Sequence, residues 1–312
     1  MKKSLLKLIL FSILPLLVLG YAVYSLSKHS DDFYRRFTSP RQNSFVLGSS
    51  RAASMDPVIM DSILHPKYPN AAIYNYSFTW AHSPYGPKYL ESIEKKLKPE
   101  TKDGVFIVTV EPTALMVDKK KPDRPEFYIE NDKSVAKTSM VAINPNIEYL
   151  FESYDPSITN EFNKKIKPPK NIVGIPTILD NGKYDLKIIK KVAPEKQEMS
   201  NQKNMRKLQE RLDGLKVSEN RILYLEKTIE FLKQHGKVMI IRMPVNTIPY
   251  SIEEKAFPDF DSRVEAVALK TKVSYINYNR LKNTYQWLDE VHLDKKSIED
   301  FSGVVARDVL SH

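Results

Sequence analysis

Three side chains in this sequence have the chemical types needed to activate a hydroxyl group. Ser50 follows an apolar run that ends at Leu47, and far downstream Asp289 and His292 stand three residues apart. A serine hydroxyl becomes a strong nucleophile when an imidazole accepts its proton, and a carboxylate must fix the tautomer of that imidazole and stabilise its cation. A turn serine or a surface histidine is the commoner explanation of either motif alone. Their combination favours a Ser-His-Asp site.

These motifs resemble two sequence blocks of the SGNH, or GDSL-like, hydrolase superfamily. The family's early Gly-Asp-Ser block is matched by Gly48-Ser49-Ser50, and its late Asp-x-x-His block is matched by Asp289 to His292. With an apolar segment in front, the chain is most similar to the membrane-anchored branch that assists O-acylation of cell-envelope polymers, such as the DltD and alginate O-acetylation proteins. The resemblance implies that Ser50 is the nucleophile, His292 the general base and Asp289 the acid that orients it.

The family's two remaining blocks match less well. The second block supplies a glycine amide to the oxyanion hole, and the nearest candidates here are Asn75 and Ser77. The third block reads Gly-x-Asn-Asp, whereas the corresponding strand end carries Glu111. Because one missing oxyanion donor costs about 3 kcal/mol of transition-state stabilisation, this departure suits a specialised acyltransferase or a weakened relative. Arg242 also ends a predicted strand, where it would bind an anionic substrate, pair with Glu111 or form a structural salt bridge.

Short apolar runs alternate with helical patterns along the chain. The runs indicate buried parallel strands at 45–47, 71–74, 105–110, 238–241 and 273–276. The helical patterns cover about 56–64, 87–97, 219–234, 253–271 and 295–310. This alternation predicts a three-layer α/β/α fold, SGNH-like or flavodoxin-like, with helices on both faces of a parallel sheet. Ser50, Ser77 and Glu111 each follow a strand, so we expect them at the carboxyl edge, where such sheets bind ligands.

The N-terminus predicts one transmembrane helix. Residues 8–26 carry no charged side chain, and roughly 20 such residues cross a bilayer as a helix. Lys2, Lys3 and Lys7 precede this segment, while Lys28 is the only basic residue shortly after it, which favours a cytoplasmic tail and an exported body. A cleaved signal peptide is the alternative, although its apolar region is usually shorter.

The chain is therefore divided into three parts. Residues 1–26 are the expected transmembrane anchor, residues 27–42 a polar stalk, and residues 43–312 one SGNH-like domain. Residues 114–215 break the alternation of strands and helices and are interpreted as an insertion. Its Asp180-Asn181-Gly182 sequence between apolar runs predicts a hairpin, and the insertion would form a lid or polymer-binding surface.

Composition limits the partners. The sequence has no cysteine, which excludes disulfides and thiolate chemistry. A formal net charge of +10 favours anionic surroundings such as lipid headgroups or acidic glycans. No nucleic-acid-binding motif, metal-spaced histidine cluster or nucleotide-binding glycine loop is present, so we expect no nucleic acid, metal or cofactor.

The leading interpretation is an exported, membrane-anchored serine esterase or O-acyltransferase that acts on an acylated envelope glycan or similar polymer, with a membrane-bound acyl-transfer partner. A non-catalytic glycan-binding or assembly protein with the same fold is the main alternative, and Glu111 at the third block favours it. An exported lipase is a third interpretation, less favoured because no long apolar surface helix accompanies the site.

Overall fold

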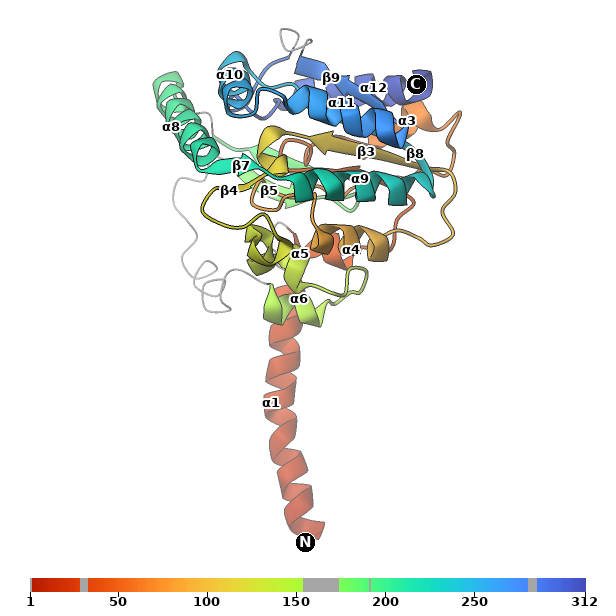
Figure 1. The fold of residues 1–312 in the computed structure, drawn as a ribbon. Helices are drawn as coiled ribbons and strands as arrows, with labels where there is room; N and C mark the ends of the chain where they lie inside the picture. Colours follow the sequence, from red (N-terminus) through yellow and green to blue (C-terminus); the bar gives the residue numbers. More distant parts are fainter. Residues whose placement is uncertain (1, 29–32, 154–173, 191, 280–284) are drawn as a thin grey trace.

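The computed structural model describes residues 2–28, 33–153, 174–190, 192–279 and 285–312. Its centre is a five-stranded sheet in the order β2-β1-β3-β8-β9, and every neighbouring pair is parallel. The strands are β1 Ser44–Leu47, β2 Ile73–Asn75, β3 Gly104–Val110, β8 Gly236–Arg242 and β9 Ser274–Asn277. The predicted α/β class and the parallel sheet are therefore confirmed (Figure 1).

Each face of the sheet is covered by helices. On one face α3 Pro57–Leu64 and α12 Lys295–Ser311 share a core with Val46 of β1 and Ile107 of β3. On the other face α4 Pro87–Lys96, α9 Glu219–Lys233 and α11 Phe260–Thr271 pack with Phe45 and Phe106. Successive strand residues thus alternate between two buried faces, which explains why these strands appear in the sequence as continuous apolar runs.

Local sequence signals set the helix ends. The Asp56 carboxylate accepts hydrogen bonds from the amides of Val58 and Ile59, and Pro57 occupies the first turn of α3. Asp294 caps α12 in the same way. The single helix expected over 253–271 is wrong, because α10 Thr247–Ala256 ends before Pro258 and α11 begins after it.

The described part of 114–215 lies outside the five-stranded sheet. After β3 come the short helices η1 Pro112–Leu115, η2 Pro125–Phe127, η3 Ile129–Asp132, α5 Ser134–Lys137 and α6 Ile147–Glu152, and the longer α8 Pro194–Asp213. Two antiparallel pairs accompany them, β4 Met116–Asp118 with β7 Leu215–Val217 and β5 Gly174–Ile178 with β6 Tyr184–Ile188. The second pair is the hairpin predicted at Asn181-Gly182, where Gly182 adopts a φ of +80°.

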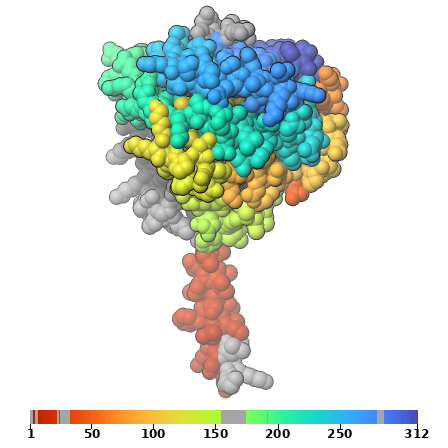
Figure 2. Space-filling model, in the orientation of Figure 1, coloured from red at the N-terminus to blue at the C-terminus, as the bar shows by residue number. Residues whose placement is uncertain are grey.

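The N-terminal helix α1 Lys2–Lys28 projects from the body (Figure 1, Figure 2). Within the described residues, no helix has the length and apolar composition that crossing a membrane requires. The expected stalk at 27–42 is wrong in its second half, because Tyr34 and Phe37 of α2 Tyr34–Thr38 are buried in the core. Both rings pack against Tyr149, with ring centroids 5.4 and 5.2 Å away.

Candidate active site

Ser50 lies in a tight turn directly after β1. The amide of Ala53 donates to the Ser50 carbonyl at 3.2 Å, and the amide of Ala52 donates to the Ser49 carbonyl at 3.1 Å. Gly48 allows the turn to approach β3, because a Cβ there would lie 1.8 Å from Thr109 Oγ1. The glycine thus permits the close contact that places Ser50 at the carboxyl edge of the sheet.

Asp289 and His292 lie in a tight loop before α12. The amide of Leu288 donates to the His292 carbonyl at 2.8 Å and closes the loop. Glu290 adopts a φ of +73°, an uncommon conformation for a residue with a side chain. It is held by the Asn246 amide, which donates to its carbonyl at 2.9 Å, and by the Asn201 side chain, which donates to its carboxylate at 3.1 Å. The loop is therefore held by α8, which contains Asn201, and by Asn246, the N-cap residue of α10 Thr247–Ala256.

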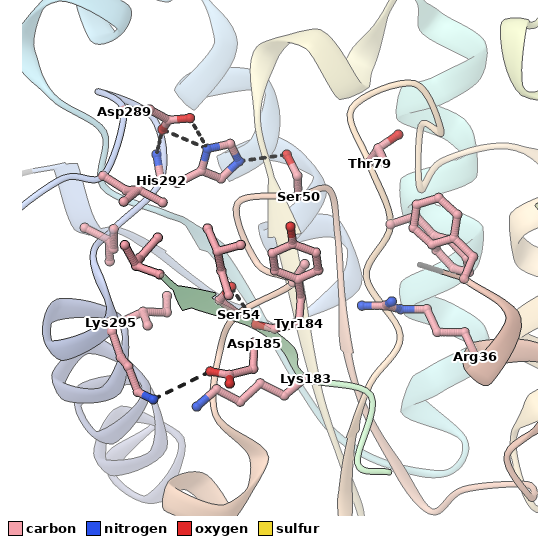
Figure 3. A pocket seen from close by; sticks show the side chains of 18 residues that line it. Arg36, Ser50, Ser54, Thr79, Lys183, Tyr184, Asp185, Asp289, His292 and Lys295 are labelled. Carbon is pink, nitrogen blue, oxygen red and sulfur yellow. Dashed lines mark hydrogen bonds and ion pairs between the residues drawn. The ribbon is translucent and has the colours of Figure 1, made fainter. Parts of the chain in front are cut away.

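The structure brings the three expected catalytic residues together (Figure 3). His292 Nε2 lies 3.0 Å from Ser50 Oγ, and His292 Nδ1 lies 2.8 and 2.9 Å from the two carboxylate oxygens of Asp289. A carboxylate can only accept, so Nδ1 carries the proton and Nε2 is left to accept the hydroxyl proton of Ser50. This is the hydrogen-bond geometry that general-base activation of a serine requires.

Asp289 is held in its ionised form. Burial would raise the pKa of Asp289, but the hydrogen bond and charge of His292, together with the backbone amides of His292 and Val291, lower it below its ordinary value. About a third of each side chain remains exposed, 32% for His292 and 28% for Asp289. Asp289 therefore carries the negative charge that orients the imidazole, and both side chains are open to a substrate.

Asn75 and Ser77 are buried and bonded to other parts of the backbone, so their expected place in an oxyanion hole at Ser50 is wrong. Asn75 is fully buried, and its Nδ2 donates to the carbonyls of Ala52, Ala53 and Met55 at 2.8, 3.1 and 3.1 Å. Its Oδ1 accepts from the amide of Ser77 at 3.1 Å, and Ser77 is fully buried as well. Asn75 instead holds the loop that follows Ser50.

Arg242 forms a structural salt bridge and does not reach the substrate site or Glu111. The Arg242 side chain is 1% exposed, and its guanidinium lies 2.8 Å from Glu254, 3.1 Å from Asp261 and 3.3 Å from Glu253. These carboxylates come from α10 and α11, and their charges raise the pKa of Arg242 against the opposing effect of burial. Of the interpretations left open by the sequence, the structural one is confirmed.

Glu111 is paired with Arg51, the residue after Ser50. Arg51 Nε lies 3.0 Å from Glu111 Oε2, and its Nη2 also forms a salt bridge with Glu253. All three side chains are almost fully buried. Sequence reasoning missed Arg51, although its position next to Ser50 was a signal. Through these two salt bridges Arg51 connects the turn at Ser50 to the end of β3 and to α10.

Two cavities meet at the three catalytic candidates. The hairpin cavity, of about 360 Å³, lies between these residues and β6. Its other walls include Phe33, Ala53, Phe78, Leu186 and Ile188. The α8 cavity, of about 270 Å³, lies toward α8, and its walls include Trp80, Glu111, Asn204, Lys207 and Leu208. Among the described residues, no cluster of acidic and histidine side chains is arranged to hold a metal ion.

No model of a known protein family matches the chain, and no curated protein is significantly similar to its sequence. The membership suggested by the Gly48-Ser49-Ser50 and Asp289 to His292 blocks therefore stays a prediction.

Proposed function

We propose that the protein is a membrane-anchored serine esterase or O-acyltransferase of the SGNH type, which acts outside the cytoplasm on an acylated envelope glycan. The observation that carries this proposal is the continuous hydrogen-bonded series from Ser50 through His292 to Asp289. Ser50 and His292 are 242 positions apart in the chain, yet Ser50 Oγ lies 3.0 Å from His292 Nε2. Nucleophilic acyl transfer requires this contact between a hydroxyl and its base.

The proposed reaction has two steps. Ser50 Oγ attacks the acyl carbonyl while His292 Nε2 takes its proton, and His292 then gives that proton to the departing alcohol. In the second step a glycan hydroxyl or water loses its proton to His292 and attacks the acyl-serine, and the proton returns to Ser50 Oγ as it leaves. Asp289 stabilises the imidazolium in both steps.

The oxyanion donors must lie elsewhere than at Asn75 and Ser77. The Ser50 amide is one candidate, as the family resemblance implies. Thr79 is a second, because it follows β2 and lines the hairpin cavity together with Ser50 (Figure 3). Its hydroxyl accepts a hydrogen bond from the Ala81 amide at 3.0 Å, which holds it in place.

The two cavities support transfer between an acyl donor and an acceptor. Ser50, Asp289 and His292 line both of them, so two substrates would reach one hydroxyl from different sides. The α8 cavity offers polar groups at Asn204 and Lys207, which suit a hydroxylated acceptor.

An N-terminal anchor would keep this site beside a membrane and its acyl-transfer partner. In α1 many large apolar side chains are exposed, among them Leu8, Leu14 and Leu17 at 67, 68 and 64%. Such a surface is unfavourable in water, and association with a membrane would cover it. The basic residues before this segment support an extracytoplasmic location for the body.

Active-site labelling tests the proposal. The full chain in phosphatidylcholine vesicles should react with a fluorescent fluorophosphonate and cleave short acyl esters, and Ser50→Ala should abolish both activities. Ser49→Ala is the matched control, since it removes the adjacent buried hydroxyl and leaves the Ser50–His292 contact in place. Undiminished labelling of Ser50→Ala would refute the assignment.

A non-catalytic glycan-binding protein remains the second candidate. The observation that favours it is Glu111, which stands where the family has an asparagine donor and is already paired with Arg51 at 3.0 Å. Glycan binding by a folded chain that neither reacts with the fluorophosphonate nor cleaves esters would support this candidate.

A further inference from the structure

The hairpin cavity has chemistry that differs from that expected for a sugar site. Most of its wall is apolar. The apolar side chains come from separate parts of the chain: Phe33, Phe78, Leu186, Ile188, Leu293 and Ile298. Its volume of about 360 Å³ falls within the range of about 300–1,000 Å³ that is common for small-molecule sites. Ser50 Oγ and the His292 ring form part of this wall (Figure 3).

The cations in the wall already have partners within the protein. Lys183 Nζ lies 2.5 Å from Asp56 Oδ2, and Lys295 Nζ lies 3.7 Å from Asp185 Oδ1. Arg36 donates to the backbone carbonyl of Gly182 at 3.0 Å. An anionic ligand would have to compete with these carboxylates, whereas a neutral apolar ligand would leave them undisturbed.

We propose that the hairpin cavity binds the apolar acyl chain of the substrate, and that this chain is several methylenes longer than acetyl. The inference rests on the proposed function, because it places the carbonyl carbon of the ester at Ser50 and extends the chain from there along β6. The acceptor then approaches Ser50 from the α8 cavity.

The cavity predicts a steep dependence on chain length. Burying one methylene contributes about 0.8 kcal/mol, which is about a fourfold gain in kcat/KM. A series of nitrophenyl esters from acetyl to dodecanoyl should therefore rise about fourfold per added methylene until the chain fills the cavity. The full chain is measured in phosphatidylcholine vesicles, because a detergent tail could occupy the same space.

Two matched variants on β6 test whether the dependence on chain length arises in the hairpin cavity. Ile188 lines the cavity and is 46% exposed, so Ile188→Trp can fill the space without entering the core. Lys187 is its exposed neighbour on β6 and is not part of the wall. Ile188→Trp should lower the ratio of octanoyl to acetyl kcat/KM at least tenfold, whereas Lys187→Trp should leave this ratio unchanged. Thermal unfolding of both variants confirms that they fold.

The possible failures are distinguishable. A flat or falling series from acetyl upward, with fluorophosphonate still labelling Ser50, would overturn the acyl-chain site and leave the serine esterase intact. An unchanged ratio in Ile188→Trp would also overturn it. Absence of both labelling and turnover for every ester would refute the proposed function itself.

Discussion

Replacing Asn75 with alanine separates a structural role from a catalytic one. The sequence suggested that Asn75 serves the oxyanion hole, but its amide donates to the carbonyls of Ala52, Ala53 and Met55 and accepts from the Ser77 amide. We therefore expect Asn75→Ala to lower the free energy of unfolding substantially.

The size of this loss depends on which hydrogen-bond partners of Asn75 keep another partner in the variant. The Ala52 carbonyl still accepts from the Met55 amide at 3.0 Å, and the Ala53 carbonyl still accepts from the Tyr184 amide at 2.7 Å. The Met55 carbonyl and the Ser77 amide lose the hydrogen bonds that the described residues give them. Each buried group left without a partner costs about 1–3 kcal/mol, so the expected loss is roughly 2–6 kcal/mol.

Urea unfolding of the full chain in detergent, followed by tryptophan fluorescence, measures this loss. Ser77→Ala is the control, because it removes only the 3.3 Å hydrogen bond from Ser77 Oγ to the Val46 carbonyl, which also accepts from the Tyr76 amide. Its expected loss is below about 1 kcal/mol. If Asn75→Ala unfolds like the unaltered protein but turns over esters about 10²- to 10³-fold more slowly, it is an oxyanion donor and our reasoning is refuted.

Three further predictions test other features. Asp289→Asn should lower kcat about 10⁴-fold, because an amide favours the wrong tautomer of the imidazole; ester turnover within tenfold of the unaltered rate would contradict the triad. Burial and nearby Lys133 lower the pKa of His82 to about 4. As the pH falls, the unfolded chain therefore binds a proton at this imidazole at a higher pH than the folded chain does. Stability should drop by about 2 kcal/mol from pH 7 to pH 5, and His82→Gln, followed by urea unfolding, should lack this drop. Gly48→Ala should destabilise by about 1–3 kcal/mol through its clash with Thr109, and Thr109→Ala should restore most of the loss in thermal unfolding.

The sequence predicted those features that local patterns determine. Apolar runs indicated the strands, Asp56 and Pro57 marked the start of α3, and Asn181-Gly182 marked the turn between β5 and β6. The conjunction of Ser50 with the Asp289 to His292 block was also visible, because each motif is short and chemically distinctive. The structure then placed their side chains within hydrogen-bond distance.

The features that sequence reasoning missed depend on contacts between distant segments. Asn75 was interpreted as a donor to substrate because nothing in the sequence shows that carbonyls 20 or more positions earlier would use its amide. The partners of Arg242 come from two later helices, and Arg51 was not singled out because its pairing with Glu111 requires β1 to lie beside β3. Tyr34 and Phe37 lie in a polar stretch, so their burial could not be inferred from the average composition around them.

The attachment of α2 to the β5–β6 hairpin has a practical consequence. Arg36 donates to the Gly182 carbonyl at 3.0 Å, and Arg35 lies 2.9 Å from Asp180, so α2 is attached to the tip of the hairpin. A chain truncated between α1 and α2 would therefore keep both contacts between α2 and the hairpin. A cut after Thr38 would instead remove Phe33 and Arg36 from the site, and a shortened chain made for crystallisation should therefore begin ahead of Phe33.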